Sequence, residues 1–302
     1  MPFDRFMALA LYHPQLGYYR TSRRRIGRHR ETDFYTATTS GPFFGELVIG
    51  ACIALLGKRD ASKYSFVEIG AEPDFSALQE VVSPFRACQT VRVGQPLALT
   101  GPCVVFSNEL FDAQPFRRFV VRNGHWREIG VQLQVSELVE VELGEVIETW
   151  LPTATTEGVR FDAPRDAVEL LEEIVRQPWT GLFLAADYGK TFRELAEATP
   201  AGTARAYAKH VQSNALLSQP GEQDLTCHVC WDWLWDTLRA HRFAEPTVQS
   251  QESFFVHHAA DVLASAFDSD STVHNPRKQA LMQLIHPGNL GQKFQVLHAL
   301  RD

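Results

Sequence analysis

The sequence lacks a long hydrophobic run, an excess of positive charge and a regular set of cysteines. No apolar stretch in its 302 residues approaches the roughly 20 needed to span a bilayer. The formal net charge of -7 argues against nucleic acid as a partner. Cysteine occurs only five times, at scattered positions, which is typical of reduced thiols and not of a disulfide framework. These absences favour a cytoplasmic protein with no membrane or nucleic acid partner.

The opening stretch MPFDRFMALALYHP also lacks the features of a secretory signal. It contains the acidic Asp4 and no small-residue cleavage site, so we expect no signal peptide. Its apolar residues recur at helical spacing, which predicts a helix that ends at His13 and Pro14. Further helices are predicted at 43–56, where apolar residues occupy nearly all sides and indicate burial, and at 166–176.

Three short apolar runs predict the centre of a parallel sheet. They are YSFVEI at 64–69, CVVFS at 103–107 and LFLAA at 182–186. Each leads directly into polar residues, as central strands of a parallel sheet do, so we expect the three to lie side by side. The stretch FVEIGAEPDFSAL at 66–78 further predicts that the first strand passes through a glycine turn into an amphipathic helix.

The remaining patterns predict an antiparallel extension and a helical region. Residues 116–121, 126–134 and 138–143 alternate like antiparallel strands. Helical periodicity dominates 191–270, and KFQVLHAL near the end is a candidate edge strand. We therefore expect an α/β fold in three regions: a helical lead-in at 1–57, a core with an antiparallel insertion at 58–190, and a mainly helical region at 191–302.

Polar residues follow each of the three apolar runs, and they form the candidate site. Ligands of open α/β sheets bind beyond the carboxyl ends of the strands. One crevice is therefore expected to receive Glu68, Gly70, Asn108, Glu109, Asp112 and Asp187, together with residues 33–36.

Glu109 and Asp112 are the candidate catalytic residues. If the chain turns helical after the strand, they share one face, where two carboxylates could orient a cationic substrate or accept its proton. The alternative is that Asp112 caps a helix and Glu109 pairs with a nearby arginine.

Other patterns are weaker. Six arginines between Arg20 and Arg30 fit a phosphate-binding or docking loop, or simply a solvated loop. CHVC at 227–230 has the spacing of half a zinc site, but no second pair follows, so we expect no metal. A serine hydrolase lacks its usual context, because no G-x-S-x-G turn follows a strand.

Several longer blocks, taken together, resemble one family. They are FDRFMALALYHPQLGYY, TDFYTATTSGPFFGEL, SNELFDAQPFRRF, DYGK, RAYAKH with QPGEQDLTCHV, and LIHPGNLGQKFQVL. In this order they resemble blocks of the MidA-like methyltransferases, which include a protein arginine methyltransferase that assists assembly of mitochondrial complex I.

The resemblance implies a Rossmann-like class I methyltransferase fold with S-adenosylmethionine as cofactor and a protein as substrate or partner. It places cofactor-binding residues at Asp33, Phe34, Thr36, Glu68, Gly70 and Asn108. It leaves two hypotheses open. The chain methylates a nitrogen, most plausibly of a protein arginine, or it is a non-catalytic relative that binds a partner protein.

The departures from the family fall on the cofactor. Where the family has E-L-G-P-G-R-G-T-L this chain has EIGAEPDFS, so Glu72 and Asp74 replace two glycines. The second strand, in ACQTVRVGQPL, offers no acidic residue to hold the ribose hydroxyls. The short spacing between Gly70 and Asn108 also indicates that the helix between these strands is cut down.

We expect the protein to bind S-adenosylmethionine more weakly than about 100 μM, or to need a partner to bind it, because two carboxylates repel the carboxylate of the cofactor. One such contact at about 4 Å costs on the order of 4 kcal/mol, or about a thousandfold in affinity. The double substitution Glu72→Gly with Asp74→Gly should tighten binding at least several-fold in calorimetric titrations. Micromolar binding that the double substitution leaves unchanged would contradict this expectation.

Overall fold

The computed structural model describes all residues except 22–24, 26, 28–31, 34–36, 74 and 269–274. The chain divides into two compact units, each assembled from three segments. Unit 1 comprises Met1–Phe34, Phe111–Leu171 and Gly189–Leu234, and unit 2 comprises Tyr35–Leu110, Glu172–Tyr188 and Trp235–Asp302. The predicted division into three consecutive regions stays a prediction. Among the described residues, no helix combines the length and apolar character needed to cross a bilayer.

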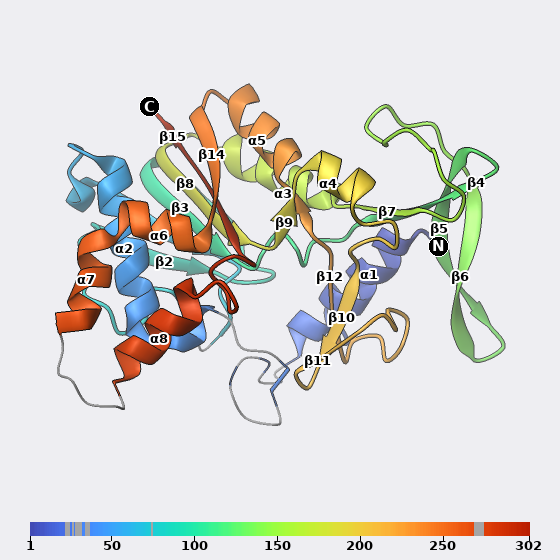
Figure 1. The fold of residues 1–302 in the computed structure, drawn as a ribbon, viewed down its shortest axis with the longest axis horizontal. Coiled ribbons are helices and arrows are strands. Elements are labelled where there is room, and N and C mark those ends of the chain that lie inside the picture. Colours follow the sequence, from blue (N-terminus) through green and yellow to red (C-terminus); the bar gives the residue numbers. More distant parts are fainter. Residues whose placement is uncertain (22–24, 26, 28–31, 34–36, 74, 269–274) are drawn as a thin grey trace. The chain divides into compact units, whose positions relative to one another are not determined.

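Unit 2 is built on a six-stranded sheet (Figure 1). Its strands, in spatial order, are β14 (Ala244–Ser250), β15 (Gln295–Arg301), β8 (Trp179–Asp187), β3 (Gly101–Asn108), β1 (Ser65–Ile69) and β2 (Ala87–Val91). Neighbours from β8 to β2 are parallel, whereas β15 is antiparallel to both β8 and β14. The three predicted central strands are β1, β3 and β8, so their side-by-side placement is confirmed.

The strand predicted near the end of the chain is present, but its predicted position at the edge of the sheet is wrong. It forms β15, which pairs with β14 on one side and β8 on the other. The reason is its apolar content, since Val296, Leu297 and Ala299 are all buried, as inner strands require.

Four helices form the core of unit 2 with this sheet (Figure 1). They are α2 (Pro42–Leu56), α6 (Gln251–His258), α7 (Ala260–Asp268) and α8 (Pro276–Ile285). Of these, α2 and α6 pack against the strands of the sheet, and α7 and α8 pack against α2 and α6. The sheet presents side chains such as Phe66 and Phe106, whose rings are tilted to each other with centroids 5.8 Å apart. As the sequence predicts, α2 is largely buried because apolar residues surround it. Short 3₁₀ helices occupy Ala37–Ser40 and Ala61–Lys63.

The amphipathic helix predicted after Gly70 is wrong. In the described part of residues 71–86 the chain forms turns, bends and an isolated bridge between Glu72 and Phe75. Pro73 and Pro84 leave only a short segment between them, and Pro84 disfavours the helical conformation at Ser83. A helix of so few residues is marginal by itself, so the chain turns instead.

Unit 1 contains three small sheets. The first has the order β6 (Glu137–Glu145), β5 (His125–Gln134), β4 (Arg117–Arg122) and β7 (Arg160–Ala163), all antiparallel. This confirms the predicted antiparallel extension. The second has the order β11 (Val211–Ser213), β10 (Arg205–Ala208) and β12 (Asp224–Thr226), and the third pairs β9 (Gly189–Lys190) with β13 (Val229–Cys230).

The prediction that helices dominate 191–270 is therefore wrong for residues 205–226. These strands are only three or four residues long, which is too short for an alternating pattern to stand out. The helix α1 (Phe3–Tyr12) is confirmed and packs its buried face against Phe116 and Leu225. Unit 1 also contains α4 (Phe192–Glu197) and a 3₁₀ turn at Tyr18–Arg20, and the unit boundaries fall within α3 (Arg165–Val175) and α5 (Trp231–Ala240).

Two histidines meet inside unit 2 beside an aromatic ring. His298 on β15 and His258 on α6 have ring centroids 5.3 Å apart, and both pack against Phe254. In the described part of the chain, the Nε2 atom of each ring is buried without a hydrogen-bond partner. Burial, reinforced by His258, lowers the pKa of His298 to about 4. Both rings are therefore neutral at pH 7.

Acid should weaken unit 2 through His298. Its pKa in the unfolded chain is about 6.5, so between that value and about 4 the unfolded state binds more protons and stability falls as the pH falls. His298→Phe keeps a ring against Phe254 but cannot be protonated. We expect the loss of unfolding free energy between pH 7 and pH 5, measured by urea titration, to be smaller in this variant. The exposed His125→Phe should keep the full loss, and an equal loss in His298→Phe would show the idea wrong.

Candidate functional site

Glu68, at the end of β1, fixes the loop that follows the strand. Its side chain is buried, and its carboxylate accepts hydrogen bonds from the Ser76 hydroxyl at 2.7 Å and from the Ala77 N–H at 2.9 and 3.0 Å. Burial raises the pKa of Glu68, while these two donors oppose the shift. The loop is thus held by one carboxylate and not by a following helix.

Gly70 is the position where this loop needs a glycine. Its φ is +84°, and a Cβ atom there would lie 2.8 Å from Leu110 Cδ1. Its N–H donates to the Val91 carbonyl at 2.8 Å, which ties the end of β1 to the end of β2. Because Ile69 pairs with Ser107, Gly70 and Asn108 leave the sheet side by side, as the strand-end rule predicts.

Asn108 and Glu109 end β3 with an unusual arrangement. Asn108 Nδ2 donates to Glu109 Oε1 at 3.0 Å, and within the described residues Asn108 Oδ1 is buried without a partner. Glu109 has a φ of +52°, which is uncommon for a residue with a side chain and costs on the order of 1 kcal/mol or more. Its N–H donates to the Ala186 carbonyl at 3.0 Å, so backbone contacts with β8 hold this conformation.

Asp187, at the end of β8, completes the row of strand ends. It is fully buried, and its carboxylate accepts hydrogen bonds from the Leu110 N–H at 3.2 Å and the Tyr188 N–H at 2.8 Å. It therefore secures the loops after β3 and β8. Glu68, Gly70, Asn108, Glu109 and Asp187 thus lie along one edge of the unit 2 sheet.

An arginine follows β2 at the position where an acidic residue would hold the ribose hydroxyls of a cofactor. Arg92 follows β2 directly, and its N–H donates to Gln95 Oε1 at 2.8 Å. Its guanidinium Nη2 donates to the Pro73 carbonyl at 2.6 Å, so this side chain bridges the loops after β2 and β1. The sequence shows that an acid is missing here but not that arginine links the two loops. The signal that could have identified Arg92 is its position directly after the predicted second strand.

Asp33 belongs to unit 1 and serves there as an anchor. Its carboxylate accepts hydrogen bonds from the Tyr18 hydroxyl and the Lys209 N–H, each at 2.8 Å. Its N–H donates to the Arg25 carbonyl at 2.7 Å, and its own carbonyl accepts from the His210 N–H at the same distance. The carboxylate is fully buried, so a role in cofactor binding stays a prediction. The other predicted residues of this block, Phe34 and Thr36, lie outside the described residues, as does Asp74.

Asp112 also belongs to unit 1, and the helix expected around it is absent. Residues 109–114 form bends and a turn, so Glu109 and Asp112 do not share a helix face and Asp112 does not cap a helix. Asp112 is buried, and its carbonyl accepts from the Cys227 N–H at 3.0 Å. The physical reason is the Gln114–Pro115 step, because the residue before a proline avoids the helical conformation. The joint action of the two carboxylates stays a prediction.

Residues 89–247 match the model of a family described as "Putative S-adenosyl-L-methionine-dependent methyltransferase". The chain belongs to this methyltransferase family. Its structure is similar to that of a COG1565 superfamily member from Burkholderia thailandensis bound to S-adenosyl-homocysteine, with 22% sequence identity, a TM-score of 0.83 and coverage of 100% of this chain and 88% of that chain.

A second solved structure, of a native COG1565 superfamily protein from Burkholderia thailandensis, has 22% identity, a TM-score of 0.80, and coverage of 100% of this chain and 87% of that chain. No curated protein matches the chain. Family membership confirms the resemblance drawn from the sequence blocks, and the structural similarity confirms the Rossmann-like fold with its antiparallel extension.

S-adenosylmethionine is the cofactor of this family, and the residues at the strand ends fit it in part. Asn108 Oδ1 is a buried acceptor that suits the amino group of the methionine portion, and Gly70 supplies the positive φ with which the chain turns beside it. The end of β2 fits less well, because Arg92 offers no acceptor to ribose hydroxyls and is tied to Pro73. The residues at the ends of β1 and β3 therefore fit the cofactor, whereas Arg92 at the end of β2 does not.

Arg92→Glu should strengthen cofactor binding. It frees the Pro73 carbonyl and places a carboxylate where two ribose hydroxyls can donate to it, so we expect S-adenosylhomocysteine to bind about 10-fold tighter in calorimetric titrations. Arg86→Glu is the matched control, because Arg86 precedes the opposite end of β2 and donates to Ser65 Oγ. Equal affinities of the two variants would remove Arg92 from the site.

Proposed function

We propose that this chain transfers the methyl group of S-adenosylmethionine to a nitrogen of an arginine side chain in a protein. Family membership supports the cofactor and the reaction class. The observation that carries the proposal is the end of β3, where the buried Asn108 Oδ1 adjoins a carboxylate held in a strained backbone conformation. Strained residues cluster at functional sites because the surrounding structure must maintain them.

The residues at the strand ends would divide the work. Asn108 Oδ1 would accept a hydrogen bond from the amino group of the cofactor, and Glu68 would keep the loop at Gly70 in place. When bound, S-adenosylmethionine supplies a methyl group on sulfonium, and the lone pair of the acceptor nitrogen bonds to that carbon as the carbon–sulfur bond breaks toward sulfur.

Glu109 would act on the acceptor. A carboxylate binds a guanidinium through charge-assisted hydrogen bonds, which would orient the acceptor nitrogen. After the new bond forms, the nitrogen carries an extra proton, and Glu109 would accept it.

The compartment proposed is the cytoplasm, with a soluble protein as acceptor. All five cysteines are free thiols, and four of them are buried, which agrees with a reducing environment.

Glu109→Gln tests the proposal most simply. It keeps the size of the side chain but removes the proton acceptor, so we expect the rate of methyl transfer to fall about 100-fold or more. The assay mixes the protein and S-adenosylmethionine labelled in its methyl group with an extract of source cells that lack this gene. Acid hydrolysis of the labelled protein should release methylarginine. Glu173→Gln, an exposed change on α3, should keep the wild-type rate.

A second function, binding a partner protein without transfer, is favoured by one contact. The bridge from Arg92 to the Pro73 carbonyl lies between two loops that a nucleoside would have to share. If wild-type protein fails to bind S-adenosylhomocysteine at millimolar concentration and labels no protein, this second function replaces the first. Label in methyl-lysine or in nucleic acid would instead retain the enzyme and overturn the arginine acceptor.

A further inference from the structure

Unit 1 contains a cavity of about 860 Å³, and none of the residues that line it belongs to the strand ends of unit 2. Its walls come from β4, β6, β7, the start of β10 and the loop at 214–220. Its volume lies within the range of sites that hold ligands of several hundred daltons. Leu138, Leu216 and Leu217 line part of it, and the other lining residues include three arginines and two glutamates.

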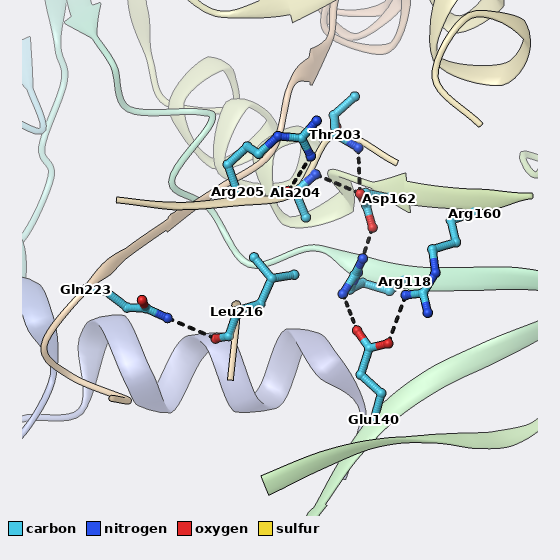
Figure 2. A network of polar contacts seen from close by, with 9 residues as sticks. All are labelled: Arg118, Glu140, Arg160, Asp162, Thr203, Ala204, Arg205, Leu216 and Gln223. Carbon is cyan, nitrogen blue, oxygen red and sulfur yellow. Dashed lines mark hydrogen bonds and ion pairs between the residues drawn. The ribbon is translucent and has the colours of Figure 1, made fainter. Parts of the chain in front are cut away.

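A network of ion pairs joins three residues that line the cavity, Arg118, Glu140 and Arg160, to the buried Asp162 (Figure 2). The Arg118 side chain, only 6% exposed, donates from Nε to Asp162 Oδ1 at 2.8 Å and from Nη1 to Glu140. Asp162 Oδ2 also accepts from the Thr203 and Ala204 N–H groups at 2.7 and 2.8 Å. These contacts fix the start of β10, which forms one wall of the cavity. The cavity is therefore preformed.

Gly202 permits this close approach of backbone to carboxylate. Its φ is +74°, and a Cβ atom there would lie 2.3 Å from Asp162 Oδ2. The network therefore depends on a glycine at this position.

The charges of the network balance except for one arginine. Glu140 accepts from Arg118 on one oxygen and from Arg160 Nη1 on the other, at 2.9 Å. Together with Asp162, it compensates both cations. Arg205 donates from Nη1 to the carbonyl of its neighbour Ala204 at 2.6 Å, and in the described part of the chain no carboxylate forms an ion pair with it. A guanidinium carries five N–H donors, so most of those on Arg205 remain available to a ligand.

The remaining lining residues select among anions. Glu137 on β6 is exposed and also lines the cavity, so a ligand with several negative charges would be repelled. One uncompensated guanidinium suits a single carboxylate, and the leucine walls suit apolar neighbours of that carboxylate. A peptide with one acidic side chain between apolar ones has both properties, whereas nucleic acid and phosphate groups do not.

We propose that this cavity binds a segment of a partner protein whose acidic side chain pairs with Arg205. The inference rests on the proposed function in taking that partner to be the methyl acceptor. This docking site would select the acceptor protein by residues other than the arginine that is methylated.

Two fluorescein-labelled peptides test the docking site. They are Ala-Leu-Asp-Leu-Ala and its Asn counterpart, both with blocked ends, and fluorescence anisotropy measures their affinity for the full chain. We expect the Asp peptide to bind at least 10-fold tighter, and Arg205→Gln to abolish the difference. Arg205→Lys should restore part of it, because it keeps the charge but not the fork of donors. Arg193→Gln, on the exposed surface of unit 1, should leave the difference unchanged.

Several results would overturn the docking site. They are equal binding of the two peptides, no binding at millimolar concentration, or the same selectivity in Arg205→Gln. Succinate that displaces the Asp peptide at lower concentration than the peptide itself would assign the cavity to a small acid instead. Titration of S-adenosylhomocysteine in the same samples separates the two proposals. If the wild-type protein does not bind this ligand, the result contradicts the proposed function and not the docking site.

Discussion

The hydrogen bonds of the Glu68 carboxylate are the interaction on which the candidate methyltransferase site depends. The described residues between β1 and β2 form no helix, so no helix N-terminus is present to order the loop after Gly70. Glu68 does this instead, by holding Ser76 and the Ala77 N–H from the end of the strand. Loss of that carboxylate would leave a buried N–H without a partner, at a cost of about 1 to 3 kcal/mol.

The site departs from the family pattern both in the loop after β1, where Glu72 replaces a glycine, and at the end of β2. The strand ends retain a glycine turn, a buried amide oxygen and a constrained Glu109, all held by backbone hydrogen bonds between parallel neighbours. The end of β2 instead carries Arg92, whose bond to Pro73 joins the two loops. Affinity for S-adenosylmethionine is therefore expected to come chiefly from the methionine side, with little help from ribose.

The sequence predicted the sheet well because short apolar runs indicate strands whose two faces are both buried. It placed β1, β3 and β8 side by side, along with the polar residues at their ends. It failed where tertiary contacts override local pattern. The segment after Gly70 looks amphipathic, yet Pro84 and the Glu68 contacts turn it away from a helix. β15 looks like an edge strand but is enclosed by β14 and β8. The Arg118 and Asp162 pair, far apart in sequence, leaves no local signal at all.

The central claim is that the carboxyl ends of β1 and β3 still form the cofactor site of this methyltransferase. A crystal structure of the chain grown with millimolar S-adenosylhomocysteine tests it most directly. We expect ligand density beside Gly70, with the amino group of the ligand within hydrogen-bond distance of Asn108 Oδ1. We also expect the Arg92 side chain to have left the Pro73 carbonyl. Density at another place, or an intact Arg92 bridge with no ligand beside Gly70, would contradict it.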